Sequence, residues 1–223
     1  DHTSSYFLAA RASKTTFKGK TGARGEINRM NSMTSNKQAL TVAKRILEQG
    51  LLGLSLPLGA EPQECLLQHL VLLEKWNQVY NLTAIRDLTK MVGAHLLDSL
   101  SVVPFVSGEN VLDVGSGAGL PGIPIAVAKP QCSVTLLDSN HKKAAFLRQV
   151  VAELALRNAN VVCQRVESWV APDGFDFIIS RAFSDLGEFV SRTGRMLASH
   201  GVIAAMKGLY PFEELDRLPA GFR

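Results

Sequence analysis

The stretch that decides the fold reads Val111-Leu-Asp113-Val-Gly115-Ser-Gly117-Ala-Gly119-Leu-Pro121-Gly122. Its first residues end an apolar strand, and the three alternate glycines let the chain turn tightly and approach a ligand without a Cβ in the way. The proline suits the first turn of a helix. Open α/β sheets bind ligands at the carboxyl ends of their strands, where strand order reverses. The stretch therefore predicts a strand, a ligand-binding turn and a helix.

Strands and helices alternate outward from this turn. Near-continuous apolar strands separated by helices indicate a parallel sheet covered on both faces, so the fold class is α/β. The expected strands are 110–114, 133–137, 161–166, 175–180 and 202–206, and the expected helices run from the turn to 129, over 142–156, over 186–197 and from 211 to 218.

The chain before the first strand has a helical pattern. Apolar residues recur at spacings of three and four between Leu66 and Tyr80, and a second amphipathic stretch follows Asp87, a good N-cap residue. We therefore expect an N-terminal helical cap over 34–106 and a sheet domain over 107–223.

The positive charge of the chain is concentrated at its start. The net charge is +4, and residues 1–33 hold six basic and two acidic residues, so residues 34–223 are neutral. Residues 1–33 are rich in Ser, Thr, Gly, Lys and Arg and have no apolar period, which predicts a disordered leader. We expect this leader to have no role in the function.

Composition excludes several classes of protein. Hydrophobic residues make up 46% and charged residues 20% of the chain, which is typical of a globular protein and not of a disordered or collagen-like one. There is no apolar run long enough to span a membrane. The three cysteines are far apart and lack a metal-binding spacing, so we expect a reduced cytoplasmic protein, a monomer, with no metal and no membrane partner.

Two kinds of nucleoside cofactor fit the glycine turn. Residues 117–122 have the spacing of a dinucleotide fingerprint, but that match alone is weak. Asp113, expected at the mouth of the pocket, would repel a pyrophosphate and attract the ammonium and sulfonium groups of S-adenosylmethionine. Asp138, at the end of the second strand, is placed to accept hydrogen bonds from ribose hydroxyls. The alternative is that both carboxylates only cap turns.

Several further motifs carry a resemblance to a known family. They are Lys75-Trp-Asn-Gln-Val-Tyr-Asn-Leu-Thr83, His95-Leu-Leu-Asp98-Ser99, Leu137-Asp138-Ser139, Ser180-Arg181-Ala-Phe183 and Met206-Lys207-Gly208. Together with the glycine turn, they make residues 66–218 resemble the bacterial small-subunit ribosomal RNA guanine-N7 methyltransferase G family, also called glucose-inhibited division protein B.

The resemblance implies a class I, Rossmann-like methyltransferase sheet and an RNA-modifying activity. The family transfers a methyl group from S-adenosylmethionine to N7 of guanosine 527 in the 530 loop of 16S rRNA, presented as naked rRNA or as a 30S subunit. The implied cofactor contacts are Gly115, Leu120, Val166, Glu167 and Arg181, with Asp138 at the ribose; the glycine turn adds Gly117 and Asp113. The family's fold continues with a C-terminal pair of strands that we expect to be missing here, which would leave the strand over 202–206 as an exposed edge.

The chemistry needs no general base, because N7 of guanine has a free lone pair. Substrate positioning is expected from Arg181, Lys207, His95 and Asp98, and RNA contact from Lys142, Lys143, Arg148 and Arg165. The alternative for Arg181 is a structural ion pair, and for His95 and Asp98 it is a polar patch between cap and core. For Lys142 and Lys143 the alternative is a solvated helix face. Other open hypotheses are a methyltransferase of a different RNA or a small molecule, a non-catalytic RNA-binding protein, and an NAD-dependent oxidoreductase, which Asp113 disfavours.

Overall fold

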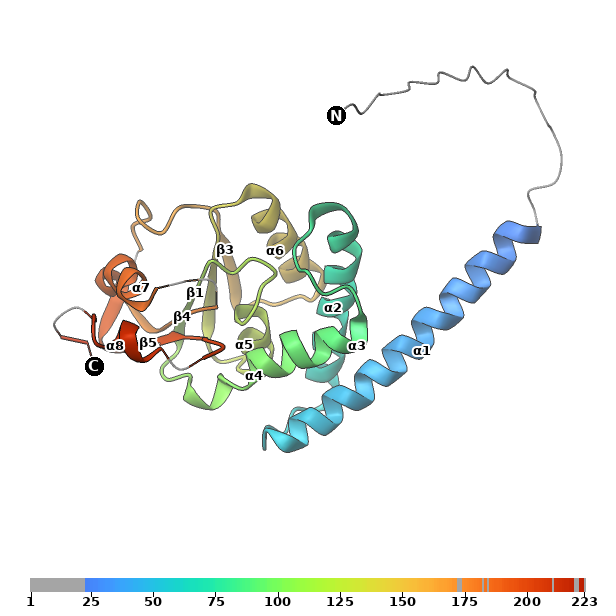
Figure 1. Cartoon of the computed structure of the whole chain (residues 1–223), viewed down its shortest axis with the longest axis horizontal. Coiled ribbons are helices and arrows are strands. Elements are labelled where there is room, and N and C mark those ends of the chain that lie inside the picture. The colour runs from blue at the N-terminus through green and yellow to red at the C-terminus, as the bar shows by residue number, and fades with distance from the viewer. Residues whose placement is uncertain are drawn as a thin grey trace, which may run out of the picture. The chain divides into compact units, whose positions relative to one another are not determined.

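The structure is a computed structural model that describes residues 23–171, 174–181, 183, 185–209, 211–218 and 221–222, with the backbone alone over 23–36 (Figure 1). The chain divides into two compact units, residues 1–37 and residues 38–223. The second unit contains the sheet and its covering layers. The predicted sheet domain and residues 38–106 of the predicted cap lie within it.

The sheet has five parallel strands in the order β3-β2-β1-β4-β5, which confirms the predicted fold class. Strand order reverses beside β1. In the described part of the chain β5 pairs with β4 alone and forms the edge of the sheet, where Val202 is 45% exposed. The strands are β1 (Asn110–Val114), β2 (Ser133–Leu137), β3 (Ala159–Val162), β4 (Phe175–Ser180) and β5 (Leu197–Ala205).

Side chains cap the first turns of several helices. Asn140 accepts hydrogen bonds from the N–H groups of Lys142 and Lys143, and Asp87 caps its helix as predicted. The helices are α1 (Ala23–Gly53), α2 (Ala60–Tyr80), α3 (Leu88–Met91), α4 (Asp98–Leu100), α5 (Gly122–Ala128), α6 (His141–Glu153), α7 (Leu186–Thr193) and α8 (Phe212–Leu215), with a π-helical segment over Val92–Leu97 and 3-10 turns over Val103–Phe105 and Gly194–Met196.

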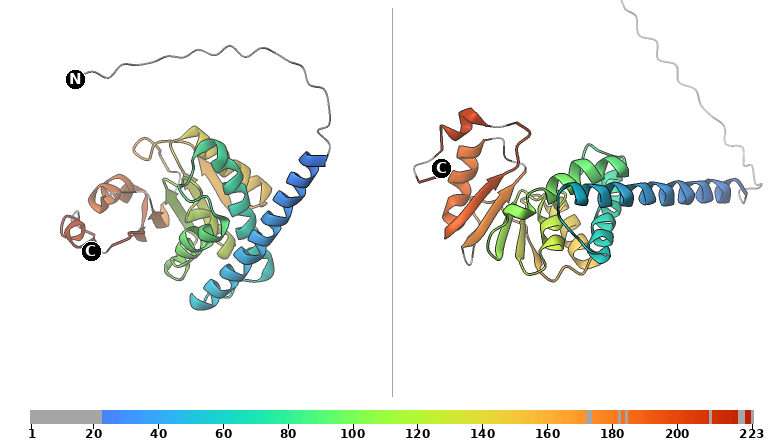
Figure 2. Two further views of the ribbon diagram at one scale, coloured as in Figure 1. Left: turned by 45° about the vertical axis from the view of Figure 1, so that its right-hand side comes forward. Right: turned by 90° about the horizontal axis from the view of Figure 1, so that it is seen from below.

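The two faces of the sheet belong to two hydrophobic clusters. Val111 of β1 lies in the larger cluster, with buried side chains of α2, α5, α6 and the last turns of α1. Leu112 and Val114 lie in the smaller cluster with Phe189 of α7. Successive strand residues point to opposite faces, which separates the two sets. Figures 1 and 2 show α7 and α8 gathered beside β5 at one end of the unit.

Residues 23–33 differ from the sequence prediction, because they form the start of α1 and not a disordered segment. Further along α1, Ala43, Leu47 and Leu51 are buried at spacings of four and fix the helix to the core. Extending an existing helix costs less free energy than nucleating one. The rest of the predicted leader, residues 1–22, lies outside the described residues.

None of the helices in the described segments is long and apolar enough to cross a membrane.

The glycine turn is fixed by its neighbouring strand. Gly115 and Gly117 have φ values of 71° and 57°, in the left-handed region that favours glycine. The N–H groups of Gly115 and Ser116 both donate to the Leu137 carbonyl, at 2.8 and 3.1 Å. The turn therefore closes over the carboxyl end of β2.

A substitution at Gly122, the first residue of α5, tests how tightly this turn is packed. A Cβ at this position would lie 2.3 Å from Leu136 Cδ2 and 2.6 Å from Asp113 Oδ2. We expect Gly122→Ala to lower the free energy of unfolding by about 1–3 kcal/mol, measured by urea denaturation. Gly93→Ala is the control, since a Cβ added there would have no contact within 4 Å beyond its chain neighbours and its own helix backbone, and it should be neutral or stabilising by up to about 1 kcal/mol. Equal effects of the two substitutions would contradict the packing argument.

Candidate cofactor-binding site

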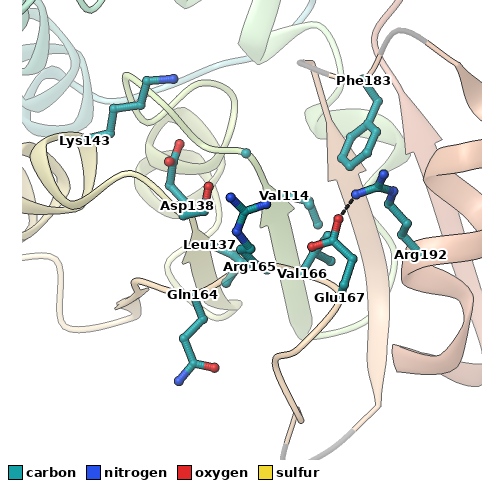
Figure 3. A pocket seen from close by; sticks show the side chains of 12 residues that line it. Val114, Leu137, Asp138, Lys143, Gln164, Arg165, Val166, Glu167, Phe183 and Arg192 are labelled. Carbon is teal, nitrogen blue, oxygen red and sulfur yellow. Dashed lines mark ion pairs between the residues drawn. The ribbon is translucent and has the colours of Figure 1, made fainter.

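A cavity of about 310 Å³ lies at the carboxyl ends of β1, β2 and β3, next to the reversal of strand order (Figure 3). Strand ends, the first turn of α6 and the segment leading into α7 all contribute to it. It is lined by Val114, Gly115, Leu137, Asp138, Ser139, Lys143, Gln164, Arg165, Val166, Glu167, Phe183 and Arg192.

Asp138 joins the parts of the chain around the cavity. Its Oδ2 accepts a hydrogen bond from Gly117 N at 2.9 Å, and its Oδ1 accepts one from Asn140 N at 2.8 Å. The residue is 6% exposed. Each carboxylate oxygen can accept two hydrogen bonds, so Asp138 retains acceptor capacity toward a ligand that carries hydroxyl groups.

A single turn after β3 forms the opposite wall. Arg165 O accepts hydrogen bonds from Ser168 N at 3.2 Å and from Trp169 N at 3.0 Å. Val166 is buried and apolar, which suits the face of an aromatic base, and the Glu167 carboxylate is ion-paired with Arg192 (Figure 3). The wall therefore combines an apolar surface with a neutralised carboxylate.

Six predicted site residues line the cavity, and four predicted cofactor contacts, Gly117, Leu120, Arg181 and Asp113, do not. Gly117 donates its N–H to Asp138, whereas Leu120 is buried in the larger hydrophobic cluster. Arg181 also lies outside the lining. The six that line the cavity are Gly115, Asp138, Lys143, Arg165, Val166 and Glu167.

Asp113 is not at the mouth of the pocket, and this expectation is wrong. Val114 lines the cavity, so the preceding residue of β1 points to the other face of the sheet. There Asp113 is fully buried and its Oδ2 accepts a hydrogen bond from Gly122 N at 3.0 Å. Its Oδ1 has no hydrogen-bond partner in the described part of the chain, and burial raises the pKa of this carboxyl to about 7.

Arg181, Asp98 and His95 form a separate polar cluster. Arg181 Nη1 lies 3.5 Å from Asp98 Oδ2 and 3.4 Å from the Ala94 carbonyl oxygen. His95 is buried with its Nε2 2.8 Å from Thr83 Oγ1, and burial lowers the pKa of its ring. The arrangement corresponds to the structural alternatives: an ion pair for Arg181 and a hydrogen-bonded polar patch for His95.

The remaining predicted residues lie on other surfaces. Lys207 pairs with Glu214, with Nζ 2.7 Å from Oε2, and lines a second cavity of about 460 Å³ beside β5. Lys142 is exposed with its Nζ 5.9 Å from the centroid of the Tyr80 ring. Arg148 is exposed further along α6.

Six lining residues are not among the predicted site residues: Val114, Leu137, Ser139, Gln164, Phe183 and Arg192. Phe183 belongs to the Ser-Arg-Ala-Phe motif at 180–183 and stacks on Phe189, with ring centroids 4.8 Å apart. Gln164 directly precedes Arg165, a predicted site residue. Arg192 lies in α7, and the sequence contains no local signal that this helix faces the strand ends.

In the described residues there is no group of three or more His, Cys, Asp or Glu side chains that could hold a metal ion.

This fold and site define a doubly wound α/β domain with its ligand cavity at the reversal of strand order. The model of the rRNA small subunit methyltransferase G family, GidB, matches residues 63–222. The chain is 56% identical to Ribosomal RNA small subunit methyltransferase G of Laribacter hongkongensis over 177 residues, covering 79% of this chain and 85% of the relative. Identity to the protein of the same name from Chromobacterium violaceum is also 56%, over 82% of this chain and 88% of the relative. The chain belongs to the rRNA small subunit methyltransferase G family, and it is an S-adenosylmethionine-dependent methyltransferase.

Solved structures of other methyltransferases are similar to this chain at lower identity. A SAM-dependent methyltransferase from Aquifex aeolicus is 23% identical with a TM-score of 0.43, covering 52% of this chain and 70% of that one. Precorrin-6y C5,15-methyltransferase from Geobacter metallireducens is 17% identical with a TM-score of 0.43, covering 62% and 71%.

The buried carboxyl of Asp113 predicts a pH-dependent stability. Its pKa is about 7 in the folded protein and about 4 in an unfolded chain, so between these values the folded state holds a proton that the unfolded state has released. The free energy of unfolding contributed by Asp113 therefore falls as pH rises from about 4 to about 7, and is constant above that range. Asp113→Asn should remove this dependence while its amide oxygen still accepts from Gly122 N.

The measurement is urea denaturation of both proteins at a series of pH values. The free energy of unfolding of Asp113→Asn minus that of the wild type should increase with pH, by up to about 1.4 kcal/mol per pH unit. Burial lowers the pKa of His69 to about 4, which gives a slope of the opposite sign in both proteins and cancels in the difference. A difference that is independent of pH would show that Asp113 ionises normally in the folded state.

Proposed function

We propose that this enzyme methylates N7 of a guanosine in the 530 loop of 16S rRNA, guanosine 527, with S-adenosylmethionine bound in the cavity at the ends of β1, β2 and β3. The observation that carries the proposal is this cavity, with Asp138 in its lining, in a chain 56% identical to proteins named Ribosomal RNA small subunit methyltransferase G. We further propose that the protein acts in the cytoplasm as a monomer, on 16S rRNA or on the 30S subunit.

The residues present fit S-adenosylmethionine. Asp138 offers carboxylate acceptors to the ribose hydroxyls, and Val166 offers an apolar surface to the adenine ring. Gly115 has no Cβ where the turn borders the cavity. The volume of about 310 Å³ is at the lower end of the range for small-molecule sites. When bound, the cofactor supplies an electrophilic methyl group attached to a positively charged sulfur.

The work of the protein in this reaction is positioning. N7 of guanine has its own lone pair, so no side chain has to remove a proton from it. The strand ends hold the cofactor, and Phe183 and Val166 present apolar surface to it. His95 is held by Thr83, and Thr83 N donates to Asn77 Oδ1 at 2.9 Å, so these motif residues order the loop that follows α2.

Arg181, Asp98 and Lys207 are proposed to position the RNA substrate. The Arg181 side chain is 28% exposed and its contact with Asp98 is long, at 3.5 Å, so its guanidinium is available to a phosphate. Lys207 lies in the segment after β5, on the far side of β4 from β1.

RNA affinity is proposed to come from a local basic patch on and beside α6. Lys143 and Arg165 line the cavity, and Lys142 and Arg148 are exposed on α6. Residues 34–223 have no net charge, so the attraction depends on these positions and not on the field of the whole molecule.

Methyl transfer to isolated 30S subunits and to naked 16S rRNA tests the function directly. Transfer of a labelled methyl group, followed by mapping of 7-methylguanosine, should place the modification in the 530 loop. Modification of another base, or transfer only to a different RNA or a small molecule, would favour the alternative methyltransferase function. Binding of NAD without binding of S-adenosylmethionine would contradict the cofactor assignment.

Asp138→Ala should weaken the binding of S-adenosylmethionine about tenfold or more, measured by calorimetry, because charge-assisted hydrogen bonds to the ribose are lost. Asp176→Ala is the matched control. The Asp176 carboxylate accepts from the N–H groups of Glu109 and Asn110, each at 2.9 Å, at the amino end of β4. The Asp176→Ala substitution should change the free energy of unfolding but not the affinity for S-adenosylmethionine. Unchanged affinity in Asp138→Ala would contradict the ribose contact.

Lys142→Ala should raise the KM for RNA and leave cofactor affinity unchanged, since Lys142 is exposed and does not line the cavity. Each lost phosphate contact reduces the slope of log K against log salt concentration by about 1. Arg157→Ala serves as the control, because Arg157 is also exposed but precedes β3, at the amino ends of the strands and away from the cavity at their carboxyl ends. If the two variants have the same salt dependence, Lys142 does not contact RNA.

A further inference from the structure

The turn over 165–169, which forms one wall of the cavity, is held by an arginine that does not itself line the cavity. Arg195 lies in the 3-10 turn Gly194–Met196 that follows α7. Its Nη1 donates to the Trp169 carbonyl at 3.1 Å, and its Nη2 donates to the Glu167 carbonyl at 3.3 Å and to the Val166 carbonyl. One guanidinium therefore binds three backbone oxygens of the turn over 165–169.

The geometry of the turn explains why a guanidinium binds it. Residues 165–169 form one helical turn, in which the last carbonyl groups have no partner within the turn itself. Cationic side chains satisfy such carbonyls and interact favourably with the negative end of the turn. A planar guanidinium has five N–H donors in a fixed arrangement, so it can serve several of these oxygens at once, which an ammonium group cannot do with the same geometry.

A second arginine binds the side chain of the same turn. Arg192 lies three residues before Arg195 and is ion-paired with Glu167 as well as with Glu188 of its own helix. Figure 3 shows Arg192 reaching Glu167 at the edge of the cavity. The backbone and the carboxylate of Glu167 are thus held by neighbouring residues at the end of α7.

We propose that Arg195 is a positioning residue for the cofactor. It sets the place of Val166 and Glu167 against the cavity, and so determines the affinity for S-adenosylmethionine without contacting it. The proposal rests on the proposed function in assigning the cavity to S-adenosylmethionine. It extends the determinants of cofactor binding from the strand ends to the 3-10 turn that follows α7.

Calorimetry with S-adenosylmethionine tests the proposal on four proteins: the wild type, Arg195→Ala, Arg195→Lys and the control Arg217→Ala. Arg217 is a suitable control because its side chain is 70% exposed and its pair with Glu213 is long, at 3.7 Å. Loss of the guanidinium should weaken cofactor binding about tenfold, the scale of one lost charge-assisted hydrogen bond. Arg195→Lys should recover part of the affinity, and Arg217→Ala should bind as the wild type does.

Free guanidinium ion, added below denaturing concentrations, provides a readout that a general loss of stability would not give. It should restore cofactor affinity in Arg195→Ala, whereas the same concentration of sodium ion should not. The KM for RNA should stay at the wild-type value.

Trp169 reports on the turn directly in a Trp76→Phe background, because its carbonyl accepts from Arg195 and its ring packs 5.9 Å from that of Phe175. Its emission should shift to longer wavelength in Arg195→Ala and return with guanidinium.

The outcomes separate this inference from the proposed function. If the wild type fails to bind S-adenosylmethionine, the proposed function is wrong. If the wild type binds and Arg195→Ala binds equally well, or if its weaker binding follows a loss of folding that guanidinium does not reverse, Arg195 has no positioning role. Should Arg195→Ala fail to fold, the comparison of Arg195→Lys with the wild type decides the question by the same measurements.

Discussion

The site depends on the parallel register of β1 and β2, in which Val114 lies opposite Leu137. Because the two strands end at the same level, the residue after β2 reaches the turn after β1. Asp138 can then accept from Gly117 N, while the Leu137 carbonyl accepts from the N–H groups of Gly115 and Ser116. A shift of the register by one residue would turn every β2 side chain to the opposite face and remove Asp138 from the cavity.

The same alternation explains why sequence reasoning misplaced Asp113. It stands two residues before Gly115, close to the ligand turn along the chain, but its side chain points to the face covered by α5, where it accepts from Gly122 N. A carboxylate at a helix N-terminus is favoured by the helix dipole, and burial opposes its charge. Its charge is therefore no argument for S-adenosylmethionine over a dinucleotide, and that distinction comes from the family to which the chain belongs.

The sequence predicts the fold where apolar runs end at polar or glycine residues. The bounds of β1, β2 and β4 match the prediction. The predicted third strand extends too far because Arg165 and Val166, although part of an apolar-rich run, leave the ladder and enter the helical turn. The predicted fifth strand starts too late, since β5 begins at Leu197 and passes the polar residues Ser199 and His200 before its apolar half. Strand-end residues of the site could be predicted from chain order, whereas the contribution of α7 depends on tertiary packing.

The contribution of α7 changes the charge at one wall of the cavity. Glu167 and Asp138 are the two carboxylates that line it, and Glu167 is paired with Arg192, which also binds Glu188. In the described part of the chain Asp138 is in no ion pair, and its carboxylate lines the cavity. A cationic cofactor therefore gains more electrostatic attraction from Asp138 than from Glu167. The role of Glu167 is to fasten the wall to α7, and α7 also holds Phe183 through the stacked ring of Phe189, so one helix fixes two sides of the cavity.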